Sequence, residues 1–301
     1  YLSGLSLRHS DALYSSRKAW LQEIQRARRP IIVLNAGEWT MRNGGAFPNA
    51  QRSGEMRAAY RRGGTVIAAG LGTQNPTVAA TADYSPQLLE ASVVAWRDAP
   101  SRDAAGFGQV APDWAYSLGA PSGDWLPPES RSLLAVTLRF DRPWPDDGWL
   151  NAVVDLAAQT GTRVVTVAQV ARDAPRAVRL AEALGGEYLV AKSTSHADMD
   201  VHVRTVYGRS LAVISDRAHA LIIGATEGAF PVGSAADPQK ISRMLAVAGL
   251  EGLTGTYSDL SDASADALAR VLPDLPSRID AARADLGQLR ERIDAALVAA
   301  E

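Results

Sequence analysis

The chain has 301 residues, of which 47% are hydrophobic and 21% charged, with a formal net charge of −2 and no cysteine. This composition excludes a disordered or collagen-like chain, a disulfide framework, a thiolate zinc site and a cysteine nucleophile. The basic excess of a nucleic-acid surface is missing, so we expect no nucleic-acid partner. No apolar run approaches the ~18 residues of a membrane span, and the start Tyr1-Leu2-Ser3-Gly4 has no signal-peptide pattern. We therefore expect a cytoplasmic protein with two domains of roughly 100–200 residues.

Short apolar runs alternate with helical patterns in the first half of the chain. The runs that predict strands are 31–35, 65–69 and 92–96. Amphipathic patterns predict helices at 13–28 and 51–62, and Gly63-Gly64 ends the second one. Residues 119–130 have no periodicity and are rich in Pro, Gly and Ser, which is typical of a linker between domains.

The second half alternates strands and helices more regularly. Near-continuous Val, Ile and Leu runs predict strands at 133–138, 163–168, 187–190, 211–214 and 230–233. Helical patterns lie between and after them, at 147–159, 175–184, 199–207, 218–226 and 238–248. Such βαβ units predict a parallel sheet covered on both faces, and right-handed crossovers make the domain doubly wound.

The last stretch, 276–301, predicts one long amphipathic helix. Its apolar residues recur at alternating spacings of three and four and form a single stripe: Ile279, Ala282, Leu286, Leu289, Ile293 and Ala296. Packing on the body of the protein is favoured over a coiled coil, since the run is short and contains Gly287. The whole prediction is an α/β fold with two doubly wound Rossmann-like domains, at 1–120 and 131–275, joined by a linker at 121–130 and followed by this helix.

The segment Ser215-Asp216-Arg217-Ala218-His219-Ala220 follows a predicted strand and opens the next helix. Ligands of parallel α/β sheets bind beyond the carboxyl ends of the strands, and the N–H groups of a first helical turn favour an anion. Arg217 offers a planar fork for phosphate or carboxylate oxygens, and His219 can donate to a phosphate or transfer a proton. The structural alternative is that Ser215 or Asp216 caps the helix and Arg217 is solvated.

Three further cations follow predicted strands. Lys240, one of three lysines, lies in a first helical turn, where it opposes the helix dipole unless an anion is bound. Arg139 ends the first strand of the second domain, and Arg97 follows a strand of the first domain within Trp96-Arg97-Asp98-Ala99-Pro100-Ser101. The structural alternatives are an exposed Lys240, a helix cap made by Asp98 or Ser101, and an Arg97–Asp98 ion pair.

Other motifs are weaker. Gly70-Leu71-Gly72 lacks the third glycine of a dinucleotide loop, and neither a P-loop nor a GxSxG elbow is present. His9, His196 and His202 form no metal-ligand spacing with carboxylates, so we expect no metal site. Trp39 and Trp125 are candidates for stacking on a sugar ring, although most tryptophans pack in the core or at its rim.

Taken in order, these segments resemble the motifs of the polysaccharide pyruvyl transferase family. Residues 96–101 are similar to its Arg-Asp-x-x-Ser box, Pro112-Asp113-Trp114-Ala115 to its Pro-Asp-x-x segment, and the strand that ends in Arg139 comes next. Residues 215–220 are similar to its Ser-x-Arg-x-His-Ala box, and Gly228-Ala229-Phe230-Pro231 then precedes Lys240. The resemblance covers residues 65–250; upstream, Ser10-Asp11-Ala12-Leu13 stands where the family has a Gly-x-x-Gly-Asp turn.

The resemblance implies a GT-B-like architecture and a pyruvyltransferase. Such enzymes move the pyruvyl group of phosphoenolpyruvate (PEP) onto two hydroxyls of a sugar, which gives a cyclic ketal and inorganic phosphate. It implies PEP as donor substrate, no cofactor, and a saccharide acceptor from a cell-surface polysaccharide or its precursor; a lipid-linked acceptor, peripheral membrane association and the oligomeric state stay open. Arg217, His219 and Lys240 are the first PEP ligands that it implies and Arg97 and Arg139 the next, with Arg217 and His219 as the catalytic pair.

The chemistry of PEP agrees with this set of cations, because its phosphate and carboxylate lie close together. Our mechanistic hypothesis is that an acid protonates the enol methylene, one acceptor hydroxyl attacks, and phosphate leaves as the second hydroxyl closes the ring. The residues do not decide whether His219 is the proton donor or a phosphate ligand. Two alternatives remain: a GT-B nucleotide-sugar glycosyltransferase, with Glu227 as a carboxylate for the ribose, and a non-catalytic protein that binds an anion or a carbohydrate.

Overall fold

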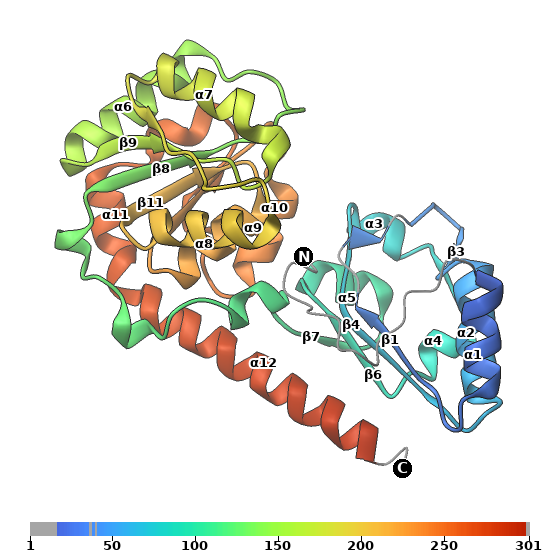
Figure 1. Cartoon of the computed structure of the whole chain (residues 1–301). Helices are drawn as coiled ribbons and strands as arrows, with labels where there is room; N and C mark the ends of the chain where they lie inside the picture. Colours follow the sequence, from blue (N-terminus) through green and yellow to red (C-terminus); the bar gives the residue numbers. More distant parts are fainter. Residues whose placement is uncertain (1–16, 36–37, 40, 299–301) are drawn as a thin grey trace. The chain divides into compact units, whose positions relative to one another are not determined.

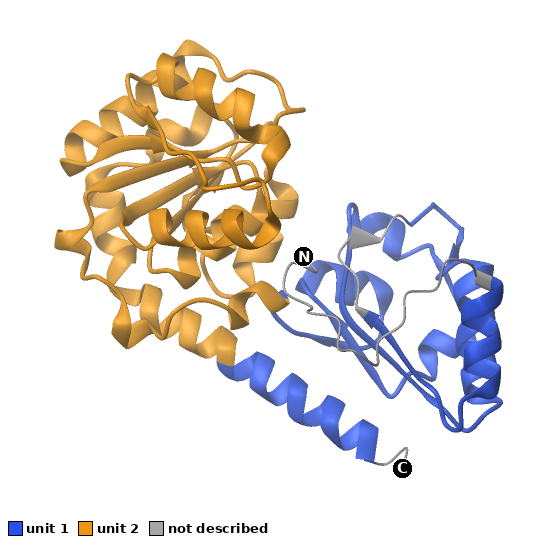
Figure 2. Ribbon diagram, viewed as in Figure 1, with its two compact units in different colours: residues 1–113, 284–301 blue, residues 114–283 orange. Residues whose placement is uncertain are grey.

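The structure is a computed structural model, and it describes residues 17–35, 38–39 and 41–298. The chain forms two compact units (Figure 2): unit 1 comprises residues 1–113 and 284–301, and unit 2 comprises residues 114–283. The unit boundary at 113/114 precedes the predicted linker at 121–130. Residues of that segment fold within unit 2, where Trp125 Nε1 donates to the Ala120 carbonyl (3.2 Å) and Arg131 Nε donates to the Leu126 carbonyl (2.8 Å).

Unit 1 is built on a parallel sheet in the order β1-β4-β6-β7, with β2 pairing the far end of β4. Its strands are β1 (Ile31–Asn35), β2 (Glu38–Trp39), β4 (Thr65–Thr73), β6 (Val93–Trp96) and β7 (Gln109–Val110); β3 (Ala46–Phe47) and β5 (Asp83–Tyr84) form a separate parallel pair. Its helices are α1 (Arg17–Arg26), α2 (Ala50–Tyr60), α3 (Pro76–Ala79), α4 (Pro86–Leu89) and α5 (Ala99–Ala105). Trp96 is fully buried and packs edge-on against Tyr84 and Phe107.

Unit 2 is built on a second parallel sheet in the order β10-β9-β8-β11-β12-β13. Figure 1 labels its strands β9, β8 and β11. Its strands are β8 (Leu133–Thr137), β9 (Arg163–Thr166), β10 (Glu187–Tyr188), β11 (Ser210–Ser215), β12 (Phe230–Ser234) and β13 (Thr254–Gly255). Numbered along this unit, the strand order is 3-2-1-4-5-6, the order of Rossmann folds. The direction of winding therefore reverses between the neighbours β8 and β11.

Helices connect these strands and cover the sheet. They are α6 (Asp147–Thr160), α7 (Ala174–Ala183), α8 (His196–Tyr207), α9 (Ala218–Thr226), α10 (Gln239–Ala246) and α11 (Ala265–Val271). Helices α6 and α7 pack on β9, while α8 and α9 pack on β11, and right-handed crossovers place these two pairs on opposite faces. Every residue of β8 and β12 is buried, as expected for strands covered on both sides.

Short turns of 3₁₀ helix complete the chain, at Trp114–Ser117, Ser122–Asp124, Pro128–Ser130, Ala171–Asp173, Glu251–Leu253, Ser258–Asp262 and Leu272–Asp274. Local signals set the helix boundaries. The Asp146 side chain accepts from Trp149 N at the start of α6, and Gly161 ends that helix in the left-handed conformation. Each such N-cap typically contributes about 1 kcal/mol.

The predicted C-terminal helix is confirmed as α12 (Leu275–Val298), which runs from unit 2 into unit 1. The first four residues of its apolar stripe, from Ile279 to Leu289, are at most 2% exposed within this single chain. The helix continues through Gly287, so the stripe packs on the chain's own residues. No helix in the described ranges is long and apolar enough to span a bilayer.

Candidate functional site

The carboxyl ends of β8 and β11 lie side by side at the point where the unit 2 sheet reverses its winding. In α/β sheets this reversal is the place where ligands bind. Two loops meet here: the segment after β8, which contains Arg139, and the segment after β11, which contains Asp216 and Arg217. Three of the predicted residues, Arg139, Arg217 and His219, thus belong to one edge of one sheet.

Hydrogen bonds tie the two loops together. Asp216 Oδ1 accepts from the backbone N–H of Arg139 (2.8 Å). The Ser215 hydroxyl donates to the Thr137 carbonyl, and its oxygen accepts from the Arg217 N–H (3.0 Å). Ser215 and Asp216 are therefore tied into the sheet edge and do not cap α9, so the structural alternative in which either residue caps this helix is wrong.

Asp173, from the connection between β9 and α7, is the buried anchor of this edge. Its side chain is only 1% exposed. It accepts from the Phe140 N–H (3.1 Å), and Arg217 Nη2 lies 2.7 Å from its Oδ1 and 2.6 Å from its Oδ2. Arg217 is therefore held by a buried carboxylate and is not solvated as the structural alternative supposed, while its buried Nε has no hydrogen-bond partner within the described residues.

Arg139 has a different partner. Its Nε and Nη2 donate to the two carboxylate oxygens of Asp141 at 2.9 and 2.7 Å, in a bidentate pair that is partly exposed. The hydrogen bonds that Arg139 donates to Asp141 raise the pKa of the Arg139 guanidinium and lower the pKa of the Asp141 carboxyl group. Arg139 is thus a fixed cation at the carboxyl edge.

Two helices begin at this edge. Helix α9 has Arg217 at its N-cap position, with no side-chain hydrogen bond capping the first turn, and His219 is its second residue. Helix α10 follows the neighbouring strand β12 and has half-buried Lys240 as its second residue; its first N–H, that of Gln239, is taken by Asp237 Oδ1 (3.1 Å). First-turn N–H groups without a side-chain cap are the feature that favours an anion.

Asp216 is buried, with 7% of its surface exposed, and its second oxygen, Oδ2, has no hydrogen-bond partner in the described part of the chain. Burial raises the pKa of its carboxyl group to about 6, although the Arg139 N–H and the charges of Arg176, Arg217 and Arg142 oppose this. The charge of Asp216 in turn helps to raise the pKa of the Tyr257 hydroxyl, after burial as the main cause. Sequence reasoning treated Asp216 only as a cap and did not find Arg142, Arg176 or Tyr257.

Arg97 lies in unit 1, directly after β6. It is 3% exposed, and its side-chain partner is Asp113, whose Oδ2 lies 3.4 Å from Arg97 Nη1. Asp98 caps α5, where it accepts from the Ser101 N–H (2.8 Å) and hydroxyl, so the predicted cap is confirmed. Because Arg97 belongs to a different unit from the other candidates, its part in a common site stays a prediction.

Gly70-Leu71-Gly72 forms the end of β4 and not a loop after a strand. The reason for glycine at position 72 is a close approach: a Cβ there would meet Arg97 Nε at 2.4 Å. Gly72, one of the two glycines that suggested part of a dinucleotide loop, is thus explained by the room that the Arg97 side chain needs.

The remaining candidates lie elsewhere. Glu227 ends α9, at the amino edge of the sheet, where it pairs with Arg204 (2.7 Å); it is therefore not beside the Arg217 site, as the ribose role supposed. His202 Nε2 is 2.9 Å from the Leu189 carbonyl oxygen. The side chain of Trp39 and all of His9 lie outside the described residues. Within the described ranges no group of three or more His, Cys, Asp or Glu is arranged to hold a metal ion.

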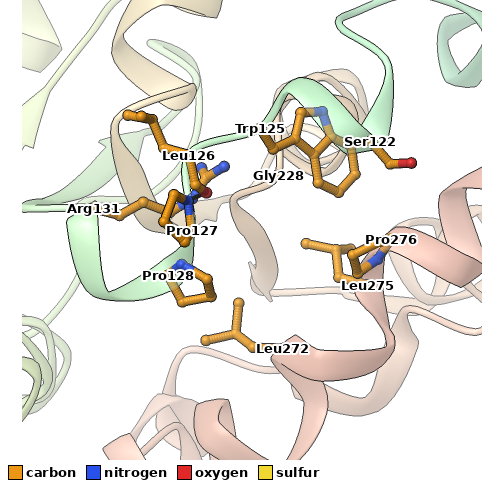
Figure 3. Close-up of a pocket in the computed structure, with 10 residues that line it drawn as sticks. All are labelled: Ser122, Trp125, Leu126, Pro127, Pro128, Arg131, Gly228, Leu272, Leu275 and Pro276. Atoms are coloured by element: carbon orange, nitrogen blue, oxygen red, sulfur yellow. Dashed lines mark hydrogen bonds between the residues drawn. The ribbon is translucent and has the colours of Figure 1, made fainter.

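A pocket of about 130 Å³ lies at the opposite, amino edge of the unit 2 sheet (Figure 3). Its lining is mostly apolar and includes the predicted stacking residue Trp125: Ser122, Trp125, Leu126, Pro127, Pro128, Arg131, Gly228, Leu272, Leu275 and Pro276. Arg131 is buried and donates to the carbonyls of Leu126, Ser210 and Glu227, so its role is structural. None of the five predicted PEP ligands lines this pocket.

Comparisons with known proteins reach only the level of the fold. No family model matches the chain, and no curated protein matches it either. Among solved structures, a crystal structure of accessory secretory proteins 1, 2 and 3 of Streptococcus pneumoniae is similar at a TM-score of 0.54 and 10% sequence identity. The match covers 94% of this chain and 57% of that one, so this chain spans little more than half of that neighbour's length. This likeness and the two parallel sheets agree with the α/β, GT-B-like fold class predicted from the sequence.

Two others among the similar structures have TM-scores below 0.5, which is too low to support an inference about this chain. A structure described as a UDP-N-acetylglucosamine 2-epimerase from Listeria monocytogenes has a TM-score of 0.49 at 14% identity, over 91% of this chain and 76% of that one. An O-GlcNAc transferase mutant from Thermobaculum terrenum has a TM-score of 0.43 at 14% identity, over 96% and 75%.

Proposed function

We propose that the protein is an enzyme that acts on sugars, and specifically a pyruvyltransferase that moves the pyruvyl group of PEP onto two hydroxyls of a saccharide. The donor site is the carboxyl edge of the unit 2 sheet. The observation that carries this proposal is the start of α9 at the reversal point between β8 and β11, where an uncapped first turn, Arg217 and His219 come together. This is the Ser-x-Arg-x-His-Ala segment of the family resemblance.

The charges at this edge suit a small molecule with two acidic groups. Arg139, Arg217 and Lys240 follow three neighbouring strands of the sheet, β8, β11 and β12, and Arg142 and Arg176 lie close enough to act on Asp216. The carboxylates Asp141 and Asp173 hold two of these guanidiniums without using all of their donors. Fixed cations of this kind stabilise phosphate as it leaves, and such electrostatic stabilisation is usually the largest catalytic effect.

The reaction needs three events. A proton goes to the methylene carbon of PEP, which makes the adjacent carbon electrophilic. An acceptor hydroxyl then attacks that carbon and loses its proton. The second hydroxyl finally displaces phosphate and closes the ketal. In this scheme Arg217, the first turn of α9, His219 and Lys240 hold the phosphate, and Arg139 adds a charge for the carboxylate.

Two measurements test the proposal. PEP is expected to raise the melting temperature of the protein while UDP-sugars do not, and mixing PEP with a saccharide acceptor is expected to release phosphate. Stabilisation by UDP-sugars alone would favour the glycosyltransferase alternative, although Glu227 then needs a different role. Stabilisation by PEP without phosphate release from any acceptor would favour a binding protein.

A further inference from the structure

We propose that Asp216 is the catalytic acid and base of this reaction: its carboxyl group gives the proton to the methylene carbon of PEP and takes one back from the attacking hydroxyl. This inference rests on the proposed function and deepens it, because the sequence left the proton donor undecided. His219 then acts as a phosphate ligand.

The first support is the geometry of the Asp216 side chain. Its Oδ1 is fixed by the Arg139 N–H at 2.8 Å, so the carboxyl group is oriented by the strand end beside it. Its Oδ2 is buried and receives no hydrogen bond from the described residues. A buried carboxyl oxygen without a partner is costly to the fold and calls for an explanation, of which a catalytic role is one.

The second support is the place of Asp216 in the sheet. It is the first residue after β11 and stands at the reversal point, next in sequence to Arg217 and three residues before His219. A proton donor must lie within hydrogen-bond reach of the reacting atom. Asp216 is one residue from Arg217, the arginine proposed to bind phosphate, and the methylene carbon of PEP is only a few bonds from its phosphate; the inference therefore places that carbon at Asp216 Oδ2.

The groups that face Asp216 set its protonation. Arg139 and Arg142 lie on the loop after β8, Arg176 lies on α7, Arg217 precedes α9, and Tyr257 follows β13. Asp141 and Asp173 pair with Arg139 and Arg217. Burial outweighs the cations and raises the Asp216 pKa to about 6. Bound PEP adds negative charge, which raises that pKa further and favours the acid form near neutral pH.

The proton balance closes without another reactant. The Asp216 carboxyl proton forms the C–H bond that turns the methylene into a methyl group, and Asp216 becomes a carboxylate. As the first acceptor hydroxyl bonds to the adjacent carbon, its proton returns to Asp216. The second hydroxyl displaces phosphate, and its proton leaves with phosphate as hydrogen phosphate. Each turnover thus restores the acid form of Asp216.

The experiment compares Asp216→Asn with the unaltered chain. Asparagine keeps an oxygen for the Arg139 N–H but cannot transfer a proton. Phosphate release from PEP is measured between pH 5 and 9 with methyl galactoside, methyl glucoside and N-acetylmannosamine as acceptors, together with deuterium uptake at the methylene of PEP in D₂O and the PEP-induced rise in melting temperature. Asp146→Asn is the matched control, because Asp146 caps α6 and asparagine caps a helix as well as aspartate does.

We expect kcat/KM for PEP, which reports the enzyme before PEP binds, to fall as the pH rises above about 6 in the unaltered chain and in the control. In Asp216→Asn the rate is expected to drop about a hundredfold or more while PEP still stabilises the protein.

An Asp216→Asn variant that keeps both the rate and the fall with pH would overturn the inference and leave the proposed function intact. A chain that binds PEP yet shows neither phosphate release nor deuterium uptake would also overturn it, whereas no effect of PEP on the melting temperature would refute the proposed function itself. If Asp216→Asn does not fold, a flat pH profile of the unaltered chain between 6 and 9 would count against the inference.

Discussion

The Asp173 side chain holds Arg217 from a connection 44 residues away, with Arg217 Nη2 2.7 Å from Asp173 Oδ1. Asp173 is fully buried and also accepts the N–H of Phe140 in the loop after β8. One carboxylate therefore fixes the guanidinium before α9 and the loop beside it. This arrangement decides which donors Arg217 can offer to an anion.

Replacing Asp173 by Asn is expected to weaken PEP binding more than it slows turnover. Asparagine can still accept from Phe140, but the Arg217 guanidinium loses its opposite charge and its fixed orientation. We expect the KM for PEP to rise about tenfold or more with a smaller change in kcat, and unit 2 to lose about 3 kcal/mol of stability because one partner of a buried pair is removed. Steady-state kinetics and denaturant unfolding measure both effects; an unchanged KM would show that Asp173 does not position Arg217.

Replacing His219 by Ala is expected to abolish ketal formation and leave the protein folded. His219 lies in the first turn of α9, where it is half-buried and its loss opens no large cavity. His202→Ala is the control, since His202 lies on α8 and contacts the carbonyl of Leu189, which follows β10, two strands away from β8 in the sheet. Circular dichroism confirms folding, and phosphate release measures activity. Near-normal turnover in His219→Ala would contradict its assignment as a ligand of the donor.

Replacing Gly72 by Ala is expected to displace Arg97. The added Cβ would meet Arg97 Nε at 2.4 Å, so the side chain must move or the strand must shift, at a cost of about 1–3 kcal/mol. Gly287→Ala in α12 is the contrasting variant, because nothing lies within 4 Å of its added Cβ and alanine favours a helix by roughly 1 kcal/mol. Thermal unfolding distinguishes them: a Gly72→Ala protein as stable as the unaltered chain would mean that Arg97 is loosely packed.

The pH dependence of stability offers a test of Asp216 that needs no substrate. Its pKa is raised from 3.8 to about 6 in the folded protein, so the folded state binds the proton more tightly than the unfolded chain does. The stability that this group contributes is therefore complete below about pH 4 and is lost as the pH rises through about 6. We expect Asp216→Asn to remove a decrease on the order of 3 kcal/mol. The unfolding free energies of the unaltered chain and of Asp216→Asn, each measured at pH 4 and at pH 8, give this decrease. If both proteins change equally between the two pH values, the pKa of Asp216 is not raised.

Much of the fold could be predicted because its signals are local. Helix α9 has the predicted bounds, and the strands of unit 2 differ from their predicted ranges by at most two residues at either end. The short strands β2, β3, β5, β7 and β13 carry too few residues for a pattern, and β4 runs on through Gly70 because its sheet neighbours continue. Pro, Gly and Ser also occur in segments that fold, as residues 121–130 do within unit 2, so composition alone does not show where a linker lies.

The candidate site was predictable only in part, for a similar reason. Residues that directly follow strands are visible in the sequence, which is how Arg139, Arg217 and His219 were found. Asp173 and Arg176 follow β9, and only the order of the strands in the sheet brings the segment after β9 beside the ends of β8 and β11. The partner of a charge is likewise a matter of tertiary structure, so Arg97 turned out to lie by Asp113 and not by Asp98.

A crystal structure of the protein with PEP bound tests the central claim most directly. The account predicts phosphate density against the first turn of α9, within hydrogen-bond distance of Arg217 and His219, with the methylene carbon beside Asp216 Oδ2. PEP bound at the pocket lined by Trp125, or bound at another face with Arg217 still engaged only by Asp173, would contradict it.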